Sequence, residues 1–432
     1  MTRTLEQRTI AKVWWRIMPY LMLLYFVGYL NRVSVGIAAL TMNKDLGLTA
    51  TVFGWGAGIF FVGYFFFEVP SNIILSRVGA RRWISRIMLT WGPISAALAL
   101  SQGPWSFYAL RFLLGMAEAG FFPGVMLYLT YWFPAAQRSR ISAGILSAVP
   151  LSNIFGAPLS SWFLTLEGLW GLKGWQVLFV LEGIPAVVLG VVTYFYLTDK
   201  PEDAAWLAPE ERDWLSATVR AEDAGRSARH GFSLREALTH PRVLACAFIY
   251  FGVLVGAYGV NFWQPQIVRG LGLSLLQTGF VTAIPSVFAV AGMFLWAHVS
   301  DRSGAHAFHV AAAATVGCLG LVGAAFFSSP VLVMASLSVA AIGINAAAAI
   351  FWSLPTSFLS GVAAAGGLAL VNAVGNLSGF LGPYMIGALK DATHGFFWPI
   401  LALSLFPLLA AIVSLLLVRV PAGTISKPAP VR

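Results

Sequence analysis

The chain has 432 residues, of which 58% are hydrophobic and only 10% are charged, and its mean hydropathy is +0.79. Because soluble domains contain about 25% charged residues, this composition excludes an ordinary soluble protein and predicts an all-α integral membrane protein. The formal net charge of +10 would suit a nucleic-acid-binding protein, but the basic residues concentrate on one side of the predicted membrane. We therefore expect the lipid bilayer, and no nucleic acid, as a partner.

Twelve apolar stretches are long enough to span a bilayer, which takes about 20 mostly apolar residues per helix. Their centres lie near residues 29, 64, 92, 118, 152, 186, 255, 288, 316, 341, 375 and 408. The first stretch, from Ile17 to Leu40, is longer than the apolar region of a signal peptide and lacks an obvious small-residue cleavage site. It predicts an uncleaved first helix.

The distribution of Lys and Arg predicts how the helices are oriented. A cytoplasmic N-terminus places 21 of the 27 basic residues on the cytoplasmic side. Two more lie within spans, and the four outside are Lys44, Lys173, Arg269 and Lys390. This bias follows the positive-inside rule, so we expect both termini in the cytoplasm.

A charged segment over residues 198–242 separates six spans from six. We therefore expect an N-terminal six-helix half over 1–197, a cytoplasmic linker over 198–242, and a C-terminal half with a short cytoplasmic tail over 243–432. Within the linker, residues from Pro209 to about Arg220 are amphipathic enough for a surface helix. Its role is either a simple tether, which we favour, or a docking site for a partner.

The two halves contain related features at a constant offset. Arg77 and Gly79 of "SRVGARR" precede Arg302 and Gly304 of "DRSGAH" by 225 residues, and Pro158 and Pro383 differ by the same number. A shared offset at separate places predicts an internal repeat. Repeated six-helix halves related along the membrane normal build transporters with a central binding site.

Longer motifs carry a family resemblance over nearly the whole chain. They are the "DRSG" loop and its partner "SRVGARR", "YALRFLLGMAEAGFFPG", "WQVLFVLEGIPA" and "GNLSGFLGPY". With these motifs the chain resembles the anion:cation symporter family of the major facilitator superfamily. The stretches "NRVSVGIAALTMNKDLGL" and "FFEVPSNIILSRVGARRW" look most like its bacterial tartrate transporter branch. The resemblance implies the twelve-helix major facilitator fold and a bacterial inner membrane protein.

Arg32 and Arg111 lie within the first and fourth spans. A cation in the membrane interior usually faces a cavity or a partner, and a guanidinium donates two parallel hydrogen bonds to a carboxylate. We expect these two residues to bind an anionic substrate, and the resemblance implies the same role. The alternative is structural, with one or both paired to Glu118 or to a backbone carbonyl.

Glu118 follows Arg111 by seven residues, which places both on one face of a helix. A carboxylate between a dry environment and an arginine can titrate when the cavity changes, so Glu118 is the candidate proton carrier. The resemblance implies this role too, and a static Arg111 to Glu118 bridge is the alternative. Well-studied sugar-acid members of the resembled family have an aspartate immediately before the first arginine, whereas this chain has Asn31, which cannot titrate. The proton stoichiometry therefore cannot be carried over.

Other polar side chains within the spans can hydrogen-bond a substrate. The candidates are Tyr29, Tyr64, Asn153, Asn261, Asn372, Asn376, Trp352 and Ser353. Each could instead join helices or belong to the core. The loops between spans two and three and between spans eight and nine are candidate gates, with residues Arg77, Gly79, Arg81, Arg82, Asp301, Arg302 and Gly304. For the in-span acids Glu68 and Glu182 we expect structural roles.

No metal-ligand cluster, phosphate-binding loop or catalytic triad is recognisable, so we expect no enzyme activity, no cofactor and no metal. Cys246 and Cys318 fall in separate spans and are expected to be buried. We predict a monomeric secondary transporter that couples protons to uptake of a small organic anion, such as the hydroxylated dicarboxylate tartrate. The alternatives are aromatic carboxylates of the phthalate or 4-hydroxyphenylacetate type, and a nutrient receptor that does not transport.

Overall fold

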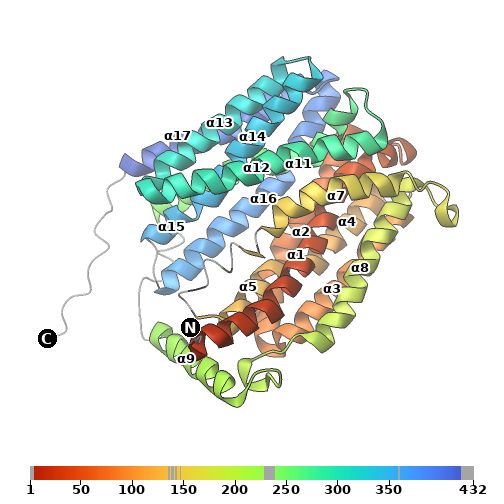
Figure 1. Ribbon diagram of the computed structural model, residues 1–432. Coiled ribbons are helices and arrows are strands. Elements are labelled where there is room, and N and C mark those ends of the chain that lie inside the picture. The colour runs from red at the N-terminus through yellow and green to blue at the C-terminus, as the bar shows by residue number, and fades with distance from the viewer. Residues whose placement is uncertain are drawn as a thin grey trace. The chain divides into compact units, whose positions relative to one another are not determined.

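A computed structural model describes residues 4–134, 137, 141, 144, 145, 147–227, 239–358 and 361–419, and all regular secondary structure in these residues is helical (Figure 1). The helices of the first half of the chain are α1 (Leu5–Asp45), α2 (Ala50–Val78), α3 (Ala80–Ala97), α4 (Pro104–Glu118), α5 (Phe121–Trp132), α7 (Ala148–Leu164) and α8 (Gly174–Tyr196). The others are α9 (Pro209–Ser227), α11 (Pro241–Arg269), α12 (Leu275–Ser303), α13 (His306–Phe326), α14 (Pro330–Phe351), α15 (Ser353–Phe358), α16 (Gly361–Thr393) and α17 (Phe397–Arg419).

Each of the twelve predicted spans has a helical counterpart among the described residues. Ten segments are long and apolar enough to cross a membrane, and one of them, Pro104–Trp132, comprises α4 and α5 together. The remaining two spans are α7, described over 17 residues, and α16, whose middle contains Asn372 and Asn376. The chain is a multi-pass membrane protein.

The fourth span is interrupted directly after Glu118. Ala119 is extended, with ψ of 134°, and Gly120 has a left-handed φ of 83° that a residue with a side chain rarely adopts. The helix therefore ends at the carboxylate and restarts at Phe121. The apolar pattern predicted one continuous span here, because a two-residue break does not change the average hydropathy.

The described chain divides into two compact units. The first contains α1 to α9 and the segments Tyr258–Val287 and Gly379–Pro399. Within it α3 packs along α8, where a Cβ on Gly92 or Gly183 would collide with the backbone of the other glycine. The second contains the remaining parts of α11, α12 and α16, together with α13, α14, α15 and most of α17. The predicted division at residues 197 and 243 stays a prediction.

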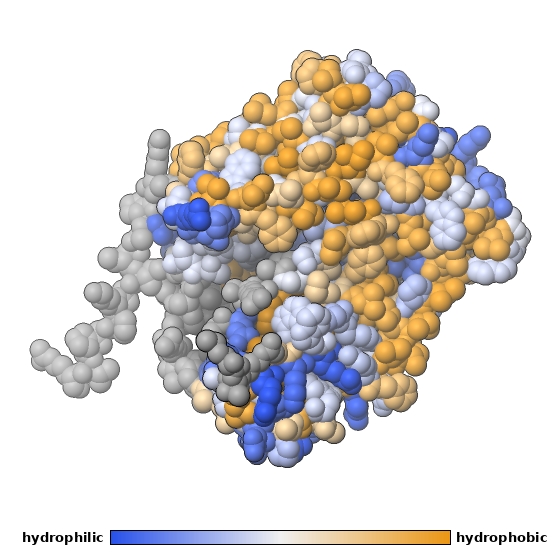
Figure 2. All heavy atoms as spheres, viewed as in Figure 1, coloured by the Kyte–Doolittle hydropathy of each residue, from blue (hydrophilic) through white to orange (hydrophobic). Residues whose placement is uncertain are grey.

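In the second unit α13 packs along α14 through small residues. A Cβ on Gly320 would meet the backbone of Ala340, and a Cβ on Gly343 would meet that of Gly317. Such close backbone contacts replace hydrophobic burial as the main attraction between helices in lipid. Large apolar side chains such as Leu295 and Phe280 stay exposed on outer helix faces, and Figure 2 shows hydrophobic residues over much of the visible surface.

The linker helix α9 is fixed to the start of α1. Glu211 is buried, and its carboxylate accepts hydrogen bonds from Arg8 Nε at 2.9 Å, Lys12 Nζ at 2.8 Å and the backbone N–H of Ala208 at 3.1 Å. The predicted surface helix is confirmed and continues to Ser227. This part of the linker is held against the first helix and is not a free tether, while residues 228–238 lie outside the described residues.

Candidate anion-binding site

Arg32 of α1 and Glu118 of α4 form an ion pair inside the first unit. Arg32 Nη2 donates to Oε1 of Glu118, and the side chains are only 12% and 5% exposed. Glu118 is the last residue of α4, so the pair joins the first span to the break in the fourth. The predicted alternative of a bridge between Arg111 and Glu118 is not what the structure shows, since Glu118 pairs with Arg32.

Aromatic rings surround the guanidinium of Arg32. Its Cζ lies 5.4 Å from the ring centroid of Tyr29, 5.1 Å from Phe60, 5.8 Å from Phe61 and 5.4 Å from Tyr64. At these distances the ring faces attract the cation and exclude water from it. Tyr29 and Tyr64, two of the predicted substrate ligands, therefore lie beside the first arginine, and their role in substrate binding stays a prediction.

Tyr258 of α11 belongs to the same cluster and was missed by the sequence analysis. Its ring packs on Phe61 with centroids 4.6 Å apart, and it interacts with Arg32. Phe60 and Phe61 were also missed. The motif "IFFVGYFFF" of α2 contains enough aromatics to suggest a cage, but its periodicity does not reveal which rings face α1.

Arg111 of α4 is completely buried and binds the backbone of α2. Its Nε donates to the carbonyl of Gly56 at 3.2 Å and its Nη2 to that of Ala57 at 3.0 Å. This is the structural alternative stated for arginines in spans. The guanidinium also faces the ring of Phe60, at 4.9 Å from the centroid, so both arginines contact the same aromatic side chain.

Each of the two arginines retains a buried donor that makes no hydrogen bond in the described part of the chain. These donors are Nε of Arg32 and Nη1 of Arg111. A buried N–H group without an acceptor costs about 1–3 kcal/mol and more when it is charged. Two such donors beside one phenyl ring make this region suited to an anion.

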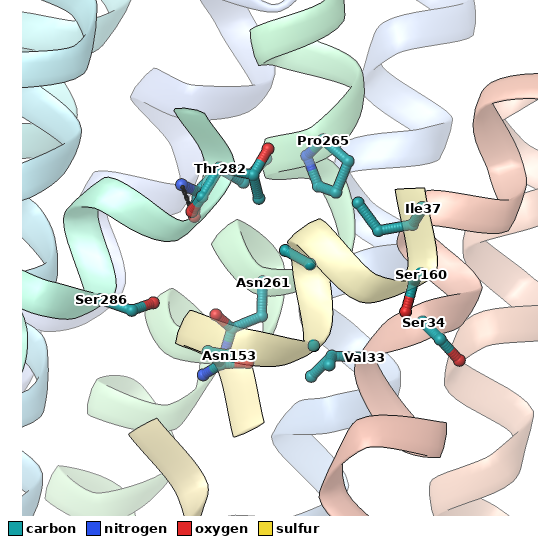
Figure 3. Close-up of a pocket in the computed structure, with 12 residues that line it drawn as sticks. Val33, Ser34, Ile37, Asn153, Ser160, Asn261, Pro265, Thr282 and Ser286 are labelled. Atoms are coloured by element: carbon teal, nitrogen blue, oxygen red, sulfur yellow. Dashed lines mark hydrogen bonds between the residues drawn. The ribbon is translucent and has the colours of Figure 1, made fainter. Parts of the chain in front are cut away.

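A small polar cavity lies beside the next turn of α1 (Figure 3). Its volume is about 20 Å³, which is room for a water molecule rather than an organic acid. Two of its lining residues, Asn153 of α7 and Asn261 of α11, are predicted substrate ligands. The polar side chains that complete the lining are Ser34, Ser160, Gln264, Thr282 and Ser286.

The other predicted ligands belong to the second unit. Trp352 packs against Tyr250, with ring centroids 4.9 Å apart, and Ser353 begins the short helix α15. Asn372 and Asn376 lie one helical turn apart on α16. Their participation in an anion site stays a prediction.

Each of the two predicted gate loops has a glycine with a positive φ. Gly79 has φ of 95° and Gly304 has φ of 69°, as expected if the loops are copies of one turn. Asp199, after α8, accepts a hydrogen bond from the backbone N–H of Arg81 at 2.8 Å and faces its guanidinium at 3.9 Å. The side chains of Arg77, Arg82, Asp301 and Arg302 are exposed. Their role in gating stays a prediction.

Neither a metal cluster nor a reactive thiol is evident in the described residues. No group of three or more His, Cys, Asp or Glu side chains there could hold a metal ion. Cys246 and Cys318 are both buried and unpaired.

Comparisons with known proteins agree with this architecture. The family model of the Major Facilitator Superfamily matches residues 21–383. A protein named "Putative tartrate transporter" from Agrobacterium vitis is 50% identical over 432 residues, 100% of both chains. A "Quinolone resistance transporter" from Acinetobacter baumannii is 42% identical over 390 residues, 90% of each chain. Among solved structures, an inward-facing bacterial homolog of the human lysosomal transporter Spinster matches 98% of this chain and 99% of its own, with a TM-score of 0.80 and 16% identity. That last likeness concerns the fold.

Proposed function

The chain belongs to the Major Facilitator Superfamily, and we propose that it takes up a small organic anion, of the hydroxylated dicarboxylate class that includes tartrate, together with protons. The proposal places it in a bacterial inner membrane as a monomer with both termini in the cytoplasm. The 50% identical relative named as a tartrate transporter supports the substrate class, and the basic residues of the predicted cytoplasmic loops support the orientation.

The observation that carries the proposal is the pair of buried guanidinium groups, one from α1 and one from α4, that both contact the ring of Phe60. Arg32 and Arg111 each have a donor without an acceptor. A dicarboxylate offers two acceptor groups, and a guanidinium fork matches the geometry of a carboxylate. Rearrangement of the contacts of Arg111 with α2 would give it a second free donor.

Glu118 supplies the link to protons. When ionised, its carboxylate forms an ion pair with the guanidinium of Arg32, as a substrate carboxylate would. Protonation removes the negative charge from Glu118 and leaves Arg32 available to the anion. Proton binding and anion binding therefore favour each other, and thermodynamic linkage makes the effect equal in both directions.

Hydroxyl groups of the substrate need further partners. The phenols of Tyr29 and Tyr64 lie beside Arg32, and the amides of Asn153 and Asn261 line the polar cavity. In the second unit, Trp352, Ser353, Asn372 and Asn376 are proposed to contribute when the substrate is enclosed.

Export of a drug is the second candidate function, because a relative at 42% identity is named a quinolone resistance transporter. Two further alternatives are uptake of aromatic carboxylates and a nutrient receptor that does not transport. The buried cations favour an anionic ligand over a neutral or cationic drug. A quinolone also carries a carboxyl group, so tartrate and a quinolone have to be compared directly.

The test is a thermal-shift screen of the purified protein with tartrate, phthalate, 4-hydroxyphenylacetate and a quinolone. A ligand at 100 times its dissociation constant adds about 2.7 kcal/mol of stability, so the cognate class is expected to raise the unfolding temperature measurably. Uptake of labelled tartrate into proteoliposomes, with and without an inward proton gradient, then separates a transporter from a receptor. A shift with the quinolone alone would contradict the proposed substrate class.

A further inference from the structure

Glu182 of α8 is a buried acid that the anion site does not use. Its residue is 2% exposed, and its Oε1 accepts a hydrogen bond of 2.6 Å from the hydroxyl of Ser160 on α7. The other oxygen, Oε2, is buried and has no hydrogen-bond partner in the described structure. The sequence analysis assigned this residue a structural role.

The groups that face Glu182 from the neighbouring helices are neutral. Ser34 of α1 and Ser160 of α7 interact with its carboxyl, and the amide of Asn31 donates to its backbone carbonyl at 3.1 Å. From α3, the hydroxyl of Ser95 donates to Asn31. None of the described residues forms an ion pair with Glu182. A carboxylate buried without a cation is costly, whereas a protonated carboxyl in the same place is far less so.

Ser160 and Ser34 connect this acid to the polar cavity. Both serines line the cavity on the side opposite α12, and Figure 3 shows them next to each other. A hydroxyl is donor and acceptor at once. Ser160 can therefore accept a proton from a protonated cavity water, a hydronium ion, while it gives its own proton to the carboxylate at Oε1. The hydronium is left as neutral water, and one O–H bond forms for each one that breaks. The cavity has room for that water.

We propose that Glu182 is a second proton-binding site of the transport cycle, loaded from the polar cavity through Ser160. The proposal rests on proton-coupled anion transport as proposed above. Glu118 contacts α1 at Arg32, and Glu182 contacts it at Ser34, so the two acids lie on two sides of this helix. An ionised Glu182 would place a negative charge beside the cavity that Asn153 and Asn261 line. A proton on Glu182 therefore favours binding of the anion, and the anion favours binding of the proton.

Infrared difference spectroscopy of the purified protein, with and without tartrate, tests the proposal at the carboxyl itself. The carbonyl band of a protonated carboxylic acid is expected to change when tartrate binds. The Glu182→Gln variant should lack this component, and Ser160→Ala should shift its frequency because the hydrogen bond to Oε1 is removed. A difference band that is identical in Glu182→Gln and in the parental protein would overturn the proposal, and so would a Glu182 band that tartrate does not change.

Transport stoichiometry gives the second readout. From the tartrate gradient that balances a set proton gradient in proteoliposomes, Glu182→Gln is expected to move one proton fewer per tartrate than the parental protein. Glu118→Gln should also lose one, and the double variant should only exchange tartrate. An unchanged proton ratio in Glu182→Gln contradicts the second site alone. If the parental protein itself shows no proton-driven uptake, the proposed function fails instead. Should Glu182→Gln not fold, Ser160→Ala still decides through its band shift.

Discussion

The carboxylate of Asp391, near the end of α16, accepts a hydrogen bond of 2.7 Å from the backbone N–H of Thr51 in the first turn of α2. Its other oxygen accepts from the backbone N–H of Ala50 at 3.1 Å. The first N–H groups of a helix have no partner within the helix, so a carboxylate placed there satisfies them and complements the helix dipole. Close backbone contact between Gly387 and Ala50 holds the two helix ends together.

Asp391→Ala is expected to lower the free energy of unfolding by about 1 kcal/mol, the typical contribution of a helix cap. Thermal unfolding in detergent measures this as a lower midpoint. Glu167→Ala, at an exposed acid without a resolved interaction of this kind, is the matched control. Equal midpoints for the two variants would show that the cap contributes nothing.

Replacing Arg32 tests the anion site. Arg32→Ala removes the central cation and leaves Glu118 buried without its partner, so tartrate affinity should fall at least tenfold, in line with the 2–5 kcal/mol typical of such truncations. Arg32→Lys should not restore it, because an ammonium lacks the two-donor fork. Isothermal titration of tartrate measures both variants. The exposed Arg269, replaced by Ala, serves as control, and normal binding by Arg32→Ala would refute the site.

The attachment of α9 should depend on pH. Burial would raise the pKa of Glu211, but its hydrogen bonds with Lys12 and Ala208 and the charges of Lys12 and Arg8 hold the pKa below its usual range. A carboxyl with a lowered pKa in the folded state stabilises that state above its unfolded pKa of about 4.3 and loses this contribution as the pH falls through the folded value.

Limited proteolysis should therefore leave α9 protected at neutral pH and cleave it under acid conditions. Glu211→Gln is expected to be cleaved in α9 already at neutral pH, because an amide cannot balance two cations. Glu210→Gln, one residue earlier and exposed, is the control. Protection of Glu211→Gln equal to that of the control would mean that other contacts hold the helix.

The sequence predicted those parts of the molecule that follow from composition and from single residues. The helices follow from apolar length, and the burial of the two in-span arginines was expected from their place in apolar segments, whereas the orientation of the helices stays a prediction. The sequence allowed pairing of either arginine with Glu118 as an alternative but left open which one pairs, because Arg111 and Glu118 share a helix whereas Arg32 lies 86 positions away in the chain. Spacing along one helix is readable, but the approach of α1 to the end of α4 depends on tertiary packing.

For the same reason the surroundings of Glu182 could not be predicted from the sequence. Its neighbours Ser34, Ser160 and Asn31 come from two other helices, and none is unusual in its own segment. The break after Glu118 was missed because "AEAGFF" contains only one glycine, whose positive φ is not evident from hydropathy. The two candidate gate loops were recognised together because the motifs "SRVGARR" and "DRSGAH" share residues at a constant offset.

The gate loops yield a prediction about conformation. Asp301 and Arg302 should stabilise the state closed to the cytoplasm through charge contacts at helix ends, of the kind that Asp199 makes with Arg81 at the other loop. Asp301→Asn should then shift the population towards the state open to the cytoplasm. Labelling rates of single cysteines introduced at both ends of the helices measure the shift. Unchanged rates, equal to those of Asp213→Asn at an exposed acid of α9, would contradict the role of the loop.

The proton dependence of tartrate binding should be altered most by Glu118→Gln. The amide resembles the protonated acid in charge, so Arg32 is no longer neutralised by its neighbour at any pH. A charge-assisted hydrogen bond contributes about 1.5–3 kcal/mol, and release of Arg32 from such a bond should raise tartrate affinity about tenfold or more at the alkaline end of the range. In the parental protein, affinity should fall as the pH rises, because ionised Glu118 competes for the guanidinium. In Glu118→Gln that part of the dependence should vanish, while exchange of labelled for unlabelled tartrate continues.

Titration of tartrate at several pH values, with Glu167→Gln as a control at an exposed acid, measures the difference. A pH profile of Glu118→Gln that follows the parental one would show that the Arg32 to Glu118 pair is a static link between α1 and α4, and that the proton sensed by the anion site binds elsewhere.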